Sequence, residues 1–435
     1  MEPIVVGGLG VLAMLVLLAL GVHVGIGMLV VGLAGFAAIG GLIGGLGMLA
    51  TTPYSTTASF AFTVLPMFIL MGEFAMHGGI AAELYDAATR WLGHLAGGLA
   101  MATTAACAAF GACSGVSVAT AAMFTRLALP EMRKYNYDDR LSCGCIAASG
   151  TLAVMIPPSG VMVIYGIMTD QSIGRLLIAG IIPGILSALM FAMAIYTIVR
   201  LNPSLARRTP VEFSWKERFI AIKWLIPMGL LFVMVVGGIY IGVFTPTEGG
   251  AVGAFITGLM ALLRRRLTSG TFVAALMDTA KTTAMVFLII IGAMIFGKFL
   301  AVTGVVVGFG NVLMNLGAPH VVILLLMLSA YIVLGMFMDV IAMMALTLPV
   351  FFPVVQSLGL DPIWFGILVV KVVEIGLITP PVGMNAYVVR ATAGDVKLEA
   401  VFQGILPFLI ADLVTTTLLV AFPAISVWLP GTMGH

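Results

Sequence analysis

The sequence predicts an all-α polytopic membrane protein made of two inverted-topology repeats, and three observations support this fold class. The chain has 435 residues, of which 61% are hydrophobic and 9% charged, with a mean hydropathy of +1.19. A soluble domain carries about 25% charged residues, so this composition indicates a membrane protein. Proline pairs interrupt two of the long apolar runs, and the second half of the chain repeats features of the first.

Ten hydrophobic stretches are long enough to cross a bilayer. They lie near residues 4–21, 24–47, 56–76, 141–169, 176–200, 219–241, 247–264, 283–301, 363–391 and 402–428. The first has no basic residues before it and no clear cleavage site, so we interpret it as a membrane span rather than a signal peptide.

Two more apolar stretches, at about 96–126 and 320–357, are too long for one span and too short for two spans with a loop. The centre of each contains glycine and polar residues, at Gly111–Thr120 and Leu334–Val340. We expect both to be re-entrant helical hairpins whose tips end inside the membrane. Ordinary long or tilted helices are the alternative.

The basic residues predict the orientation. With these assignments, 17 of the 20 lysines and arginines border the segments 77–95, 126–140, 200–218, 264–281 and 391–400, which share one side. An excess of positive charge marks cytoplasmic loops, so both termini are expected on the outer, periplasmic side. The predicted domains are a first repeat at 1–200, a cytoplasmic connector at 201–218 and a second repeat at 219–435.

The predicted spans 141–169 and 363–391 each contain two consecutive prolines, Pro157-Pro158 and Pro380-Pro381. Proline has no N–H group, so the carbonyls four residues earlier lose their helical partners. Those carbonyls belong to Ala153, Val154, Gly376 and Leu377. Irregular backbone survives in a membrane only where protein, water or an ion satisfies it. A purely structural kink is the alternative.

The two halves match at a constant spacing of 223 residues. The matched pairs are Pro130 with Pro353, Asp138 with Asp361, Pro157 with Pro380, Pro158 with Pro381, and Gly160 with Gly383. In the predicted topology the first hairpin enters from the cytoplasm and the second from outside, so the repeats are inverted. Inverted repeats with broken helices are typical of secondary transporters.

The breaks and tips contain the residues that could bind an ion or a substrate. Ser114, Ser117 and Thr120 lie beside Gly115 in the first tip, Gly335 and Asp339 lie in the second, and Thr379 precedes the second break. Carbonyl and hydroxyl oxygens without a cluster of carboxylates favour a monovalent hard cation such as Na⁺. The helix starts at Ser159–Gly160 and Val382–Gly383 carry positive dipole ends that favour an anionic substrate, and Asn385 lies one turn further on.

The remaining observations concern the charged residues within a span, the cysteines and the motifs that the sequence lacks. Lys371 and Glu374 are three residues apart in a span and predict an internal ion pair. The four cysteines lie among small residues and are interpreted as packing residues. The sequence has no HExxH motif and no Walker-type motif, which argues against an enzyme and against ATP hydrolysis. It also lacks a basic stripe with interleaved aromatics, so no nucleic-acid partner is expected.

Six stretches together resemble the large membrane subunit of TRAP (tripartite ATP-independent periplasmic) transporters. They are TVLPMFILMGEF at 63–74, GACSGVSVATAAMF at 111–124, IPPSGVMVIYG at 156–166, FTPTEGGAVGA at 244–254, LGMFMDVIAMMALTLPVFFPV at 334–354 and GLDPIWFGILVVKVVEIGLITPPVGMN at 359–385. They follow in the expected order and extend over most of the chain.

This resemblance implies an elevator-type, Na⁺-coupled importer of a small organic acid in the bacterial inner membrane, with no cofactor besides the coupling ion. It implies two partners, a periplasmic substrate-binding protein and a separate small four-helix membrane subunit. It suggests one sodium site at Ser114, Gly115, Ala153, Ile156 and Pro158, and another at Gly335, Gly376, Thr379 and Val382. The first tip has Ala112-Cys113 where relatives often have small hydroxylated residues, which puts the ligating side chain there in doubt.

Two other function classes compete with this reading. One is a stand-alone sodium–anion symporter without a binding protein, and the other is a membrane scaffold or enzyme that transports nothing. The sequence does not name the substrate, because a binding protein outside this chain largely selects it.

Overall fold

The computed structural model describes residues 2–206, 213–315 and 317–433, and every regular element in these ranges is helical. Eight helices in the described ranges are long and apolar enough to cross a membrane, or nine if one bent pair counts as a single span. The predicted all-α polytopic fold is therefore confirmed. Part of the predicted connector, including Arg207 and Arg208, lies outside the described residues.

The N-terminal helices are α1 (Pro3–Ala19) and α2 (Val24–Thr57). Within α2 the backbone turns at Gly41, whose φ of 77° and ψ of 161° favour glycine. The chain doubles back there, because a Cβ on Gly45 would lie 3.0 Å from the Cβ of Ala37. The predicted span 24–47 is therefore wrong at its end. The sequence on both sides of the turn is apolar and rich in glycine, so no local pattern marks where the turn lies.

Two groups of helices flank the hairpins. The first group consists of α1 and α2, the short turn η1 (Phe60–Thr63), α3 (Val64–His77) and α4 (Ile80–Leu92). The second comprises α11 (Trp215–Phe232), the π turn η3 (Val233–Gly237), α12 (Gly238–Tyr240), α13 (Pro246–Leu263), α14 (Ser269–Thr303) and α15 (Val305–Asn315). Segments 77–95 and 264–281, predicted as loops, are largely helical, because their polar residues lie on helix surfaces.

Local sequence explains where several of these helices begin. The side chains of Ser214, Thr245 and Thr268 each accept a hydrogen bond from the backbone N–H three residues later. The residue at that third position bonds back to the capping residue, which completes a capping box. These three helices therefore begin where their local sequence specifies it.

The first predicted hairpin is α5 (Gly98–Ser114) and α6 (Ser117–Lys134), and the first broken helix is α7 (Asp139–Met155) with α8 (Gly160–Thr169). They are followed by α9 (Ile173–Ala179), α10 (Ile181–Leu201) and the turn η2 (Pro203–Leu205). The second hairpin is α16 (His320–Gly335) and α17 (Val340–Ser357), and the second broken helix is α18 (Pro362–Ile378) with α19 (Met384–Ala393). The chain ends with α20 (Leu398–Ala421) and α21 (Ala424–Gly431).

The 223-residue spacing seen in the sequence reappears in the helix bounds. Both ends of α6 and α17 differ by 223 residues, and so do both ends of α7 and α18. Asp138 and Asp361 each accept hydrogen bonds from N–H groups in the first turn of the broken helix that follows. The Arg140 guanidinium, hydrogen-bonded to Asp138, holds the pKa of that carboxyl below its usual range.

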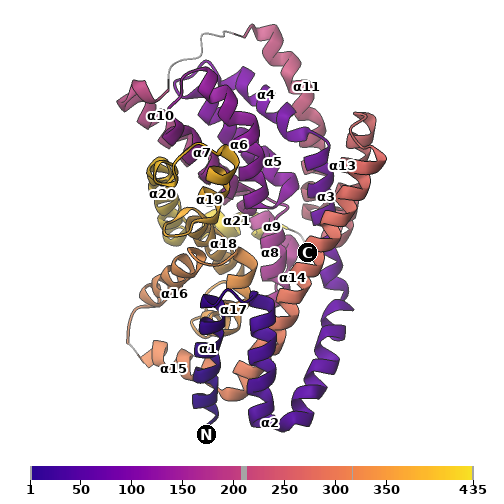
Figure 1. Ribbon diagram of the computed structural model, residues 1–435, viewed down its shortest axis with the longest axis vertical. Coiled ribbons are helices and arrows are strands. Elements are labelled where there is room, and N and C mark those ends of the chain that lie inside the picture. Colours follow the sequence, from indigo (N-terminus) through magenta and orange to yellow (C-terminus); the bar gives the residue numbers. More distant parts are fainter. Residues whose placement is uncertain (1, 207–212, 316, 434–435) are drawn as a thin grey trace.

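The flanking helices pair across the two halves. Helices α1 and α2 lie against α14 at one end of the molecule, while α13 and α11 lie against α3 and α4 at the other (Figure 1). The broken helix α7 packs closely on α20 through Gly144 and Gly404, where a Cβ on Gly404 would overlap the Arg140 carbonyl. The hairpins and broken helices of both halves therefore form one packed body next to α3 and α14.

Candidate functional site

The first hairpin tip contains a chain of two hydroxyl groups. Buried Ser114 ends α5, and Gly115 follows with a left-handed φ of 59°. Thr120 Oγ1 donates to the Val116 carbonyl at 2.9 Å and lies 2.9 Å from Ser114 Oγ. Because the Thr120 proton is already committed, Ser114 donates to Thr120, and the lone pairs of Ser114 stay available to a cation.

The first tip meets the first break. Helices α7 and α8 are bent by 43° at the break. A Cβ on Gly111 would lie 2.6 Å from the Cα of Ala153, and one on Gly115 would lie 3.4 Å from the Pro158 carbonyl. Ile156 is part of the same break, but its side chain lies against Gly184 of α10. The structure thus places Ala153 and Pro158 of the predicted first site next to the first tip, while the Ile156 side chain lies toward α10.

The second tip meets the second break in the same way. A Cβ on Gly376 would lie 2.7 Å from the Cα of Gly335, so α16 and α18 touch through these glycines. Thr379 Oγ1 donates to the Ile375 carbonyl at 2.5 Å, which leaves its lone pairs free. Val382 lies half-buried within the break.

One detail of the second break corrects the sequence prediction. The Gly376 carbonyl, expected to lose its partner, accepts the N–H of Thr379 at 3.2 Å. The last turn of α18 tightens to a three-residue hydrogen bond, a common way for a helix end to satisfy a carbonyl. Gly376 therefore keeps a hydrogen-bond partner, whereas Leu377 lacks the helical donor, because Pro381 has no N–H group.

The two breaks differ in exposure. Pro157 and Pro158 are buried, whereas Pro380 and Pro381 are exposed. Next to the second break, Phe337 of the second tip is 61% exposed. The first tip is closed by α3, where a Cβ on Gly72 would lie 3.0 Å from the Ser114 carbonyl. The prolines of the first break are therefore more buried than those of the second.

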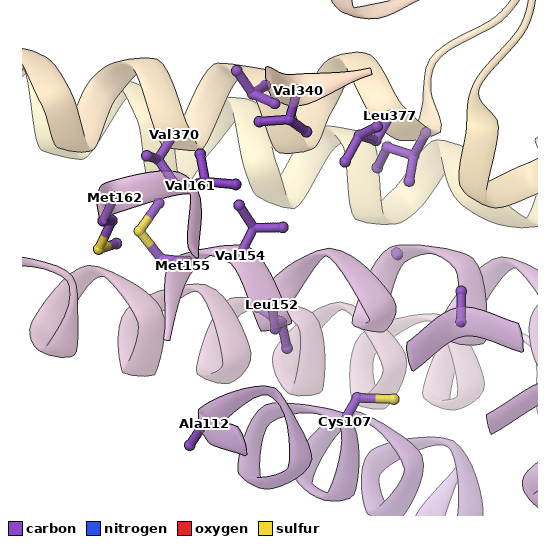
Figure 2. Packing of buried hydrophobic residues seen from close by; sticks show 14 of the residues in the cluster. Cys107, Ala112, Leu152, Val154, Met155, Val161, Met162, Val340, Val370 and Leu377 are labelled. Carbon is purple, nitrogen blue, oxygen red and sulfur yellow. The ribbon is translucent and has the colours of Figure 1, made fainter. Parts of the chain in front are cut away.

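A cavity of about 300 Å³ lies where both tips and both breaks meet α3 and α14. Its walls include polar or backbone groups from Ser114, Gly115, Ser117, Pro158, Gly160, Thr282, Asp339, Leu377 and Met384. Figure 2 shows Val154 and Val161 of the first half facing Val340 and Leu377 of the second, and all four residues line the cavity. The cavity is therefore mostly apolar, with few polar groups.

Four helices begin at this cavity, at Ser117, Gly160, Val340 and Met384. Two of the starts are capped by their own side chains. Ser159 Oγ accepts the N–H of Met162 at 3.4 Å, and Asp339 Oδ1 accepts the N–H of Ile341 at 2.9 Å. The starts of α6 and α19, after Val116 and Gly383, have no side-chain cap. Their positive dipole ends therefore lie at the cavity wall without a side-chain cap.

Asn385 joins the halves next to those uncapped starts. Its Nδ2 donates to Ser117 Oγ at 2.7 Å and to the Ala147 carbonyl at 2.9 Å. The side chain is fully buried, and its Oδ1 has no hydrogen-bond partner. Asn385 therefore fixes α19 to the first tip and to α7.

The predicted Lys371–Glu374 ion pair is confirmed and is part of a larger cluster. Lys371 Nζ donates to Glu374 Oε2 at 2.8 Å, to Ser187 Oγ at 3.0 Å and to Asp412 Oδ1. All four side chains are fully buried. The cluster ties α18 to α10 and α20. Asp412 was missed in the sequence, although it is the one acidic residue in the span 402–428, which is itself a signal of a functional or paired group.

We predict that Lys371→Met lowers the free energy of unfolding by about 3–5 kcal/mol, because it leaves buried carboxylates without their cation. Lys134→Met is the matched control, since the exposed Lys134–Glu131 pair contributes about 0–1 kcal/mol. Thermal unfolding of the purified protein in detergent compares the two variants. Equal midpoints for both variants and the parent protein would contradict this role for the cluster.

Comparison with known proteins gives the family. Residues 11–425 match the family described as tripartite ATP-independent periplasmic transporter, DctM component. The chain is 36% identical to the C4-dicarboxylate TRAP transporter large permease protein DctM of Pseudomonas aeruginosa, over 89% of this chain and 90% of that protein. It is 33% identical to the isethionate TRAP transporter permease protein DctMQ of Oleidesulfovibrio alaskensis, over 95% of this chain and 65% of that protein.

Among solved structures, the YdaH transporter of Alcanivorax borkumensis has a similar fold. Its TM-score is 0.62 at 16% identity, over 87% of this chain and 89% of that chain. At this identity the likeness concerns the fold alone. It agrees with the all-helical fold described above. The chain belongs to the DctM-component family of tripartite ATP-independent periplasmic transporters, and it is a transporter component and not an enzyme.

Proposed function

We propose that this chain is the membrane subunit that couples Na⁺ entry to the uptake of a small organic anion. The observation that carries the proposal is the cavity at which both hairpin tips, both proline breaks and two uncapped helix starts meet. Broken helices that meet in this way form the ion and substrate sites of many secondary transporters.

The cavity favours an anion. The starts of α6 and α19 have no side-chain cap and place positive dipole ends at its wall. Ser117 adds a hydroxyl group, and the one carboxylate in the wall, Asp339, is engaged with the first N–H groups of α17. A volume of about 300 Å³ suits a small organic acid. The relatives named for C4-dicarboxylate and isethionate are consistent with a small carboxylate or sulfonate.

The proposed sodium sites flank this cavity, one at each tip. Site 1 uses Ser114 Oγ with backbone oxygens of Gly115, Ala153, Ile156 and Pro158, and site 2 uses Thr379 Oγ1 with backbone oxygens of Gly335, Gly376 and Val382. Each hydroxyl donates its proton to a protein acceptor and presents lone pairs. Neutral oxygen ligands without a carboxylate cluster suit Na⁺ better than a divalent ion.

In this proposal, the two inverted halves provide the symmetry that alternating access needs. The equal spacing of helix bounds and the crosswise pairing of α2 with α14 and of α13 with α3 support two inverted repeats. The difference in burial between the two proline breaks is consistent with one of the two states of an elevator transporter. In this proposal the hairpins and broken helices slide as one body past α1–α4 and α11–α15, while Ser159 and Asp339 stabilise the helix starts that bound the cavity.

The partners are proposed from the family and the relatives. A tripartite transporter has two further components, here a periplasmic substrate-binding protein and a small four-helix membrane subunit. The relative named DctMQ extends well beyond the part that this chain matches, which is consistent with a small subunit carried there in the same polypeptide. The alternative, a stand-alone sodium–anion symporter, would transport in liposomes with neither partner present.

Removing one proposed sodium ligand should weaken sodium activation. Thr379→Val keeps the side-chain shape and deletes the oxygen, and a lost hydrogen bond or ligand costs about 1–3 kcal/mol. At about 1.4 kcal/mol per factor of ten, the half-saturating sodium concentration should rise several-fold to about a hundredfold. Ser114→Ala should act similarly through site 1. Sodium-dependent uptake in proteoliposomes measures both changes.

Thr417→Val is the matched control for the sodium experiment. Thr417 Oγ1 also donates to the carbonyl four residues earlier, but it lies exposed on α20 away from the breaks. Its sodium dependence should equal that of the parent protein. If Thr379→Val and Ser114→Ala also keep the parental sodium dependence, neither hydroxyl is a ligand.

The proposed orientation places the basic loops in the cytoplasm and both termini in the periplasm. In a cysteine-free background, a cysteine at Ser204 should resist a membrane-impermeant thiol reagent in intact cells, whereas one at Ala318 should react. The opposite labelling pattern would reverse the topology and the side to which each hairpin opens.

A further inference from the structure

A second cluster of polar side chains lies outside the transport cavity, between α3 and α14. Glu73 and His77 are one turn apart on α3, and Asp278 is on α14. We propose that these three residues bind a divalent first-row transition-metal ion such as Zn²⁺. This inference is independent of the proposed sodium coupling, because none of the three residues lines the cavity.

The geometry suits a metal with three protein ligands. One ligand atom from each residue lies within 4.8 Å of the other two, and His77 Nε2 is 3.9 Å from Glu73 Oε2. Zinc binds imidazole nitrogen and carboxylate oxygen at about 2.0–2.2 Å, which places neighbouring ligand atoms about 3.3 Å apart. Small side-chain rotations therefore bring the three atoms to bonding distance. Among the described residues, this is the one group of three or more such side chains placed to hold a metal.

The α3 and α14 backbones are already held together at this point. The rings of Phe74 and Phe272 stack with centroids 6.0 Å apart, next to Glu73 on one helix and in the first turn of the other. Because the helix ends are fixed by this contact, a metal would join ligands on two already adjacent helices. Preorganisation of this kind lowers the ordering cost of binding.

The carboxylates of Glu73 and Asp278 and the imidazole of His77 lie close together, and the cation Lys281 is near them. Lys281 Nζ lies 3.6 Å from Asp278 Oδ1, but its side chain is 69% exposed. An exposed ion pair of this kind contributes about 0–1 kcal/mol, so a divalent ion displaces it at small cost. The side chains of His77 and Glu73 are 26% and 17% exposed, which leaves a solvent-facing position where water completes the coordination.

The donor set selects the class of ion. Imidazole nitrogen is a ligand of Zn²⁺, Ni²⁺ and Cu²⁺, while Mg²⁺ and Ca²⁺ prefer oxygen ligands alone. We therefore expect saturable Zn²⁺ binding with one ion per chain and no comparable response to Mg²⁺. Metal binding at these positions would clamp α3 to α14, the two long helices that line one side of the transport cavity.

The test uses the purified, tag-free full chain in detergent. Isothermal titration with Zn²⁺ should show one site, and saturating Zn²⁺ should raise the unfolding midpoint. His77→Gln and the more conservative Asp278→Asn should each weaken Zn²⁺ binding by at least about tenfold, since even residues that only support ligands cost 10–100-fold. His94→Gln is the matched control, because His94 is exposed and outside the cluster.

Three results would overturn this site. One is the absence of saturable Zn²⁺ binding, and another is Zn²⁺ binding that His77→Gln and Asp278→Asn leave unchanged. The third is an equal loss in His94→Gln, which would place the ion elsewhere on the surface. Since Asp278 is half-exposed, Asp278→Asn is expected to fold normally and keeps the test informative if His77→Gln does not fold.

Discussion

A broken helix inside a membrane must satisfy its free backbone groups, and the rest of this structure is arranged around that requirement. Both proline pairs end a helix, and a hairpin tip from the same half packs at each break. Glycines permit the approach, with Gly111 against Ala153 in the first half and Gly335 against Gly376 in the second. The same contacts gather the oxygens proposed to bind sodium.

The breaks pack closely around a cavity, and the helices that form its walls determine how polar it is. Its walls are apolar because the helices that form it are membrane helices, and its polarity comes from helix starts rather than from charged side chains. Two of the starts are capped by the side chains of Ser159 and Asp339, whereas those of α6 and α19 have no side-chain cap. Asn385 and the Lys371 cluster then hold helices of the two halves together.

The features that the sequence predicted are those with local causes. Proline pairs break helices wherever they occur, and Asp138 and Asp361 cap the helices that follow them. The ends of the helices at both proline pairs and the Lys371–Glu374 pair were therefore found, and the bounds of α7 and α18 keep the 223-residue spacing. The family also followed from motifs at these places.

What the sequence missed depends on contacts between distant segments or on single backbone angles. The reversal at Gly41 requires one glycine among many to adopt a positive φ. The contact of Asn385 with Ser117 joins residues 268 positions apart, and Lys371 finds Asp412 on another helix. The hydrogen bond to the Gly376 carbonyl depends on how the last turn of α18 tightens. No local pattern encodes such pairings.

The central claim is that oxygens at the two tips and breaks couple sodium entry to anion uptake. The most direct measurement is uptake of a radiolabelled anion by proteoliposomes that contain this chain and its two partners, with and without an inward sodium gradient. The account predicts uptake above equilibrium with the gradient and its collapse when a sodium ionophore is added. Concentrative uptake that persists in sodium-free buffer on both sides of the membrane would contradict it.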